Sequence, residues 1–142
     1  MTVFAAIVTA IVASLSAGPA VSANVYRARL RPLAASVSTA VVVRLASANP
    51  ERFDIGGAPV DFTTQIAVEC YARSITTTAD LAADALLESV YARLMADPSL
   101  GGTVMDINLA GVNFDFDADA EQFAAITLTL DVRHRASSTT LN

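Results

Sequence analysis

Hydrophobic side chains near the start of the chain recur with the period of an α-helix. The apolar positions that share one helical face are Phe4, Ile7, Val8, Ile11 and Leu15. Threonine, alanine and serine fall on the opposite face, so the pattern predicts an amphipathic helix that packs on a core. Gly18 and Pro19 follow and end this first helix.

The same segment also has features of a secretory signal, because its apolar stretch leads to small residues before Asn24. A signal normally begins with positive charge, whereas the first basic residue of this chain is Arg27. The apolar run also falls short of the roughly 20 residues that span a bilayer. We therefore interpret the segment as a packed helix and expect no membrane contact. A secreted bacterial binding domain remains the alternative.

Further along the chain, apolar and polar residues alternate with the period of a β-strand. The segments with this pattern are residues 24–31, 38–47, 60–73, 103–110 and 122–135. In the clearest case the apolar side chains from Val60 to Cys70 share one face, and polar side chains share the other. One buried face and one solvated face are typical of an antiparallel sheet. Residues 48–59 contain proline and a Gly-Gly pair and are predicted to form a loop.

A second helix is predicted over residues 80–96, with Thr76–Thr78 offering an N-cap. Its core stripe comprises Ala79, Ala83, Leu86, Leu87, Val90 and Leu94. Asp80, Asp84 and Glu88 recur at four-residue spacing and form an acidic ridge on the same helix. Pro98 and the pair Gly101–Gly102 end this helix.

The order of these elements is α-β-β-β-α-β-β, and it predicts an α+β fold. We expect a mainly antiparallel sheet of about four to five strands, with both helices packed on one face. The chain has 142 residues, which suits one domain, predicted over residues 1–135. Residues 136–142 are predicted to be a flexible C-terminal tail.

Composition adds an expectation about assembly. Charged residues make up 16% of the chain and hydrophobic residues 54%. A small domain with so little charge is expected to cover part of its surface in an assembly. The net charge of −5 argues against tight nucleic-acid binding, because that binding needs clustered positive charge.

Candidate chemistry is sparse. A single Cys70 excludes an internal disulfide and a cysteine zinc site, and a single His134 excludes the histidine pairs of zinc enzymes. The chain has no Gly-x-Ser-x-Gly elbow and no Gly-x-Gly-x-x-Gly motif. We therefore predict a protein that is not an enzyme and needs no cofactor.

In an acidic segment, Asp115, Asp117 and Asp119 alternate like the start of a calcium loop. The pattern then fails, since Ala120 stands where that loop needs glycine and Ile126 where it needs a bidentate glutamate. We interpret residues 115–121 as a solvated hairpin turn whose charge resists edge-to-edge pairing, and we predict no metal site.

The residues expected to act are therefore interfacial. One face of a predicted strand carries three guanidinium groups, those of Arg27, Arg29 and Arg31. The row is either a solvated surface or a clamp that binds acidic neighbours or passing DNA phosphates. The acidic ridge of the second helix is an available partner for that row across a subunit boundary. Residues 48–59 and the turn at residues 115–121 are further candidate contact sites.

Residues 78–135 resemble the tail-terminator family of long-tailed phages, also called minor tail protein U. The resemblance rests on the second helix, the break at Asp97-Pro-Ser-Leu100, the short strand, the Asp-rich turn and the closing strand. It implies a homo-oligomeric ring, a hexamer in the best-known cases, on the head-proximal end of the tail tube. Such a ring stops polymerisation of the tail tube protein and joins the tail to a head–tail connector or neck protein. Genomic DNA passes through its lumen without sequence-specific binding.

The resemblance also implies a location in the virion tail, and in the host cytoplasm during assembly. This sequence departs from the family pattern in its longer, more apolar first helix and in its lack of tryptophan. Another head–tail connector, neck or tail-completion subunit with the same plan therefore stays open.

Overall fold

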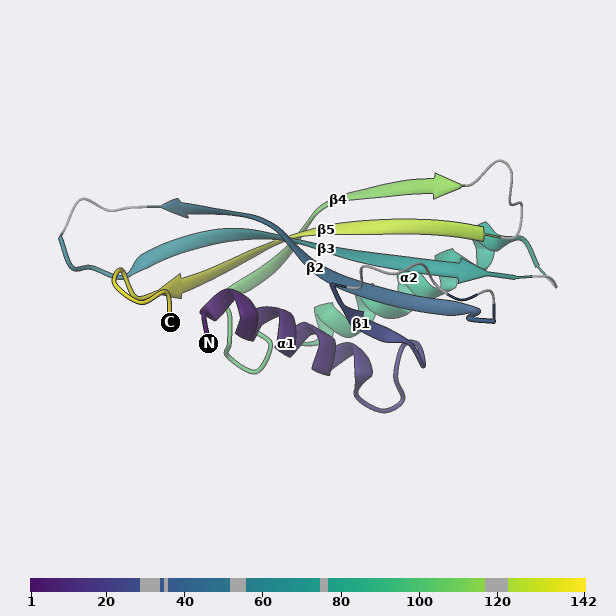
Figure 1. Cartoon of the computed structure of the whole chain (residues 1–142), viewed down its shortest axis with the longest axis horizontal. Helices are drawn as coiled ribbons and strands as arrows, with labels where there is room; N and C mark the ends of the chain where they lie inside the picture. The colour runs from purple at the N-terminus through teal and green to yellow at the C-terminus, as the bar shows by residue number, and fades with distance from the viewer. Residues whose placement is uncertain (29–33, 35, 52–55, 75–76, 117–122) are drawn as a thin grey trace.

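The computed structural model describes the chain except for residues 29–33, 35, 52–55, 75–76 and 117–122. Two helices and five strands follow one another in the predicted order α-β-β-β-α-β-β (Figure 1). Their bounds are α1 Val3–Ser16, β1 Val25–Arg27, β2 Thr39–Glu51, β3 Val60–Arg73, α2 Ala79–Ala96, β4 Asp106–Phe116 and β5 Phe123–Ala136. The predicted α+β fold is confirmed.

The five strands form one sheet in the order β1-β2-β3-β5-β4. β1 pairs with β2 in parallel, and the other neighbours pair antiparallel. Figure 1 shows both helices beneath the same face of this sheet, with α1 towards β1 and β2. The sheet is therefore mixed but mainly antiparallel, and β1 and β4 lie at its opposite edges.

The core fills the space between the helices and the covered sheet face. From α1 it takes Ile7, Val8, Ile11 and Leu15, and from α2 Ala79, Ala83, Leu86, Val90 and Leu94. Alternate residues of β3 and β5 contribute from the sheet, with Ile66, Val68 and Cys70 opposite Leu130, Leu128 and Ile126. Val41 and Val43 of β2 and Ile107 of β4 also belong to the core. The predicted stripes of both helices are thus confirmed, except that Phe4 and Leu87 are only partly buried. α1 is an integral part of the core.

β1 is shorter than the predicted strand over residues 24–31. It ends at Arg27 because Ala28 takes a left-handed conformation with φ 45°. The Ala28 N–H still donates to the Val43 carbonyl, 2.9 Å away. Arg29 and Arg31 lie outside the described residues, so the predicted row of three guanidinium groups is described only at Arg27.

The predicted loop over residues 48–59 begins later than expected, because β2 continues to Glu51. Pro50 lies inside this strand, opposite Phe62. Proline is tolerated there because β1 pairs only with Val41–Val43, which leaves the distal part of β2 at an edge. The local rule that treats proline as a strand breaker failed at an edge position.

β4 also differs from its predicted range of 103–110, since it spans Asp106–Phe116. The preceding turn is built on Asp97, whose carboxylate accepts hydrogen bonds from the N–H groups of Ser99 and Gly101. Leu100, Gly101 and Gly102 have positive φ, which delays the start of the strand. The register shifts at a bulge between Leu109 and Gly111, and β4 continues to pair with β5 beyond the expected end.

The end of the chain lies against its beginning. β5 takes in Ala136, one residue beyond the predicted domain end. The Leu141 carbonyl then accepts a hydrogen bond of 2.9 Å from the Val3 N–H at the start of α1. This contact satisfies one of the N–H groups that a helix N-terminus leaves without an internal partner.

Candidate interaction surfaces

The acidic ridge of α2, formed by Asp80, Asp84 and Glu88, is exposed. Thr78 precedes the helix, and hydrogen bonds from its side chain and from the Leu81 N–H lower the pKa of Asp80. Among the described residues none of the three carboxylates forms an ion pair. The ridge is therefore a solvated row of negative charge that is available to a partner.

Apolar side chains lie beside this ridge. Asp80, Asp84, Leu87 and Tyr91 share one flank of α2 by helical spacing, and Tyr91 is 41% exposed. The opposite flank faces α1, because Arg93 donates hydrogen bonds to a carbonyl in the last turn of α1 and to the carbonyl of the residue that follows the helix. β4 continues the sheet beyond this free flank, and there Leu109 is 41% exposed. We call Tyr91, Leu109 and the acidic ridge the α2–β4 surface.

At the opposite edge of the sheet, Arg27 ends β1 and is exposed. Its Nη1 donates a hydrogen bond of 2.9 Å to Oγ1 of Thr9 on α1. Ala5, Thr9, Val12 and Ser16 recur at helical spacing and share this outer flank of α1. We call these four residues and Arg27 the α1–β1 surface.

The structure separates the two predicted charged sets within one subunit. The α1–β1 surface and the α2–β4 surface lie at opposite edges of the sheet, because β1 and β4 are its end strands. Arg27 and the acidic ridge therefore lie apart within one subunit. Asp115 is exposed near the end of β4, whereas Asp117 and Asp119 lie outside the described residues.

The outer sheet face, which no helix covers in Figure 1, carries ion pairs that sequence reasoning missed. Arg135 donates to both carboxylate oxygens of Asp61, at 2.6 and 3.1 Å, and holds the pKa of Asp61 below its usual range. Arg44 donates to Glu69, whose second oxygen accepts from the Tyr71 hydroxyl at 2.6 Å. Burial and this neighbouring carboxylate raise the pKa of Tyr71 to about 12. Only the strand register could have identified these pairs, since their partners lie far apart in the chain.

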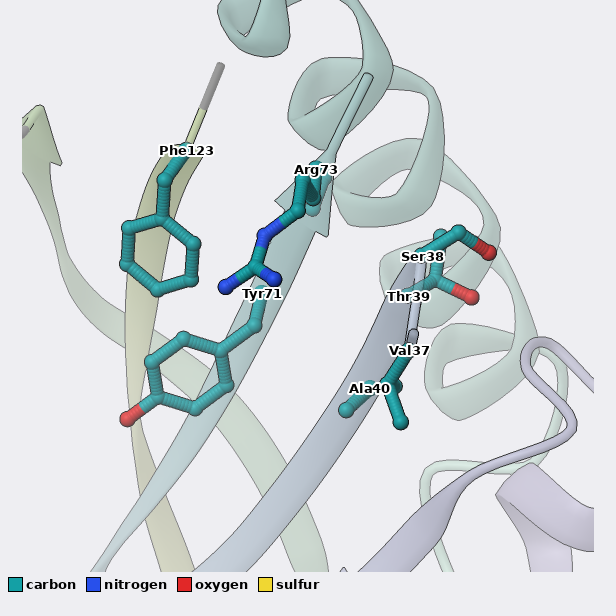
Figure 2. Close-up of a pocket in the computed structure, with 8 residues that line it drawn as sticks. Val37, Ser38, Thr39, Ala40, Tyr71, Arg73 and Phe123 are labelled. Carbon is teal, nitrogen blue, oxygen red and sulfur yellow. The ribbon is translucent and has the colours of Figure 1, made fainter. Parts of the chain in front are cut away.

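One end of that face carries a shallow hollow between β2, β3 and β5 (Figure 2). The Arg73 guanidinium reaches across it and lies 5.7 Å from the centre of the Phe123 ring. Tyr71 stacks on the same ring, with 5.9 Å between the centroids. The guanidinium and the two rings stabilise one another through cation–π and stacking contacts. Three of the residues that line the hollow are therefore bound to one another.

The residues singled out for chemistry are structural. Cys70 is completely buried, and burial raises the pKa of its thiol to about 12, so it stays a protonated core residue. Within the described ranges no group of three or more His, Cys, Asp or Glu side chains is placed to hold a metal ion. No helix in the same ranges is both long and apolar enough to cross a bilayer.

His134 is buried at the end of β5, where it is 1% exposed. Its Nε2 lies 2.7 Å from Oγ1 of Thr64, and its ring stacks on Phe62 and meets Phe4 edge-on. Nδ1 is also buried, without a hydrogen-bond partner among the described residues. Burial therefore lowers the pKa of His134, against a smaller opposing effect of Asp61.

This burial predicts a pH dependence of stability. Because the pKa of His134 is lower in the folded chain than its ordinary 6.5, the unfolded chain binds the proton more readily. Stability should be fully present above pH 6.5 and should fall as the pH drops below that value. Urea unfolding at several pH values measures this, with His134→Gln as the control that should lack this loss. An equal pH dependence in both proteins would contradict the prediction.

Comparison with known proteins identifies the fold and no family. No protein-family model and no curated protein matches the chain. Among solved structures, the chain is similar to a chain of the virion of a native gene transfer agent particle. That match has a TM-score of 0.57 and 15% sequence identity, and it covers 94% of this chain and 98% of the other. The two chains share their fold over nearly their whole lengths.

Proposed function

We propose that this protein is a structural virion protein of a phage-like particle and has no enzymatic activity. The observation that carries the proposal is the shared fold with a chain of a gene transfer agent virion, over nearly all of both chains. A fold alone does not imply a function. Here the exposed surfaces also support a structural role, because the charged and apolar groups of α1, α2 and β4 lie on exposed edges rather than around a cleft.

We further propose that the protein is a tail terminator. In this role it forms a ring, a hexamer by resemblance, that caps the head-proximal end of the tail tube. The ring stops polymerisation of the tube protein and joins the tail to a connector or neck protein. The support is the order of helix, break, strand, acidic turn and closing strand, which resembles the terminator family.

The same role requires DNA to pass without being held. The net charge of −5 gives weak attraction for phosphate. On the outer sheet face Arg44 and Arg135 are already paired with Glu69 and Asp61, which reduces the positive charge offered to DNA. These pairings support a surface along which genomic DNA slides, if that face lines the lumen.

Tail length tests the terminator role. Deletion of the gene that encodes this protein is expected to give overlong tail tubes without heads, because nothing then stops the addition of tube protein. Electron microscopy measures tube length, and the deletion complemented with the intact gene is the control. Tubes of normal length that fail to join heads would contradict termination and favour the alternative, another connector, neck or tail-completion subunit.

A further inference from the structure

α1 exposes an uncharged flank at the edge of the fold. None of its 14 residues carries a charge, yet Thr9, Ala13 and Ser16 are exposed. The solvent-facing side of a surface helix usually carries charged and polar residues, and here it carries only small uncharged ones. The outer flank of α1 therefore has the composition of a surface that a partner covers.

The opposite edge has the complementary properties. On the α2–β4 surface, Tyr91 and Leu109 offer exposed apolar area. The acidic ridge borders this apolar area and forms no ion pair within the described part of the subunit. The α2–β4 surface thus needs an uncharged apolar partner with a positive group beside it.

The α1–β1 surface is such a partner. Ala5 and Val12 are half-buried on this flank, where Val12 also packs against the core of its own subunit, and Arg27 holds its guanidinium beside the helix on Thr9. We propose that the α1–β1 surface of one copy of this chain binds the α2–β4 surface of the next copy. In this contact α1 packs against Tyr91 and Leu109, and Arg27 faces the acidic ridge.

Such a contact joins two different surfaces, so it is head-to-tail rather than two-fold symmetric. Repetition of a head-to-tail contact gives a closed ring when the rotation closes, and an open filament when it does not. Only closure into a ring rests on the proposed terminator function. The contact itself is argued from the charge and apolar area at the two edges.

Charge reversal tests the contact in the purified full-length protein. Sedimentation velocity over a series of concentrations should show association that weakens with added salt. Arg27→Glu, or Asp84→Arg combined with Glu88→Arg, should each weaken association about tenfold, because attraction is replaced by repulsion. These three side chains are exposed, so circular dichroism and the melting temperature should stay unchanged.

Mixing the two variants gives the sharper result. The altered α1–β1 surface of the Arg27→Glu protein fits only the altered α2–β4 surface of the other protein. The unchanged α1–β1 surface of that other protein likewise fits the unchanged α2–β4 surface of the Arg27→Glu protein. The mixture should therefore regain association, with the two variants in alternating order, although each variant alone associates weakly. Glu51→Arg reverses an exposed charge outside both surfaces and is the matched control, expected to associate like the unchanged protein.

Three outcomes would overturn the proposed contact: a monomer at every concentration, association that the reversals leave unchanged, or a mixture of variants that stays apart. The outcome is independent of the terminator role. If the reversals abolish association while deletion particles keep tails of normal length, the contact stands and the terminator role falls.

Discussion

Replacing Ile11 with alanine is expected to lower the free energy of unfolding by about 2–5 kcal/mol. Ile11 is completely buried between α1 and the sheet, so the substitution removes apolar contact and leaves a cavity. Urea unfolding followed by circular dichroism measures the change as a lower transition midpoint at an unchanged slope.

Ser16→Ala on the exposed flank of α1 is the matched control and should change stability little. An Ile11→Ala protein as stable as the control would mean that α1 does not contribute to the core. That result would favour the alternative that this segment is a secretory signal, because a cleaved signal adds nothing to the stability of the mature domain.

Replacing Arg93 with methionine is expected to lower the free energy of unfolding by about 2 kcal/mol. Its guanidinium donates hydrogen bonds to three carbonyls at and beyond the end of α1: Ser14 and Ala17 at 3.0 and 2.8 Å, and Pro19 at 2.6 Å. A helix C-terminus leaves carbonyls without internal partners and carries partial negative charge, so a cation there stabilises it. Methionine keeps much of the apolar stem and removes every donor.

Arg44→Met is the control for Arg93, since Arg44 also pairs through its guanidinium but is half exposed. Exposed ion pairs contribute at most about 1 kcal/mol, so Arg44→Met should be the milder change. Thermal unfolding of both variants makes the comparison. Equal losses of stability would show that the three carbonyl contacts of Arg93 add nothing beyond an ordinary surface pair.

The sequence predicted helices and strands correctly where the spacing of hydrophobic residues along the chain determines the type of element. The predicted strand over residues 60–73 coincides with β3, and the α1 stripe from Ile7 to Leu15 is buried as expected. The errors fell at Ala28, where a positive φ ends β1, and at Pro50 and Gly111, where β2 and β4 continue past an edge proline and a bulge. These features depend on neighbouring strands, which a local pattern does not contain.

The candidate surfaces divide in the same way. The exposure of Asp80, Asp84 and Glu88 followed from helical spacing alone, because spacing determines which side of a helix faces away from the core. The interactions of Arg93, of His134 with Thr64, and of Asp61 with Arg135 did not follow from the sequence. Each joins residues at least 70 positions apart, and such pairs meet only when the strand order brings them together.

By itself, the sequence determined the order of helices and strands, the faces they bury and the absence of familiar catalytic motifs, because these depend on residues close together in the chain. The tertiary structure alone decided that β1 and β4 are the sheet edges, and so that Arg27 and the acidic ridge lie on opposite sides of the subunit. Strand order is set by packing across the whole sheet, to which every strand contributes. That separation makes a contact between Arg27 and the ridge possible only between two copies of the chain.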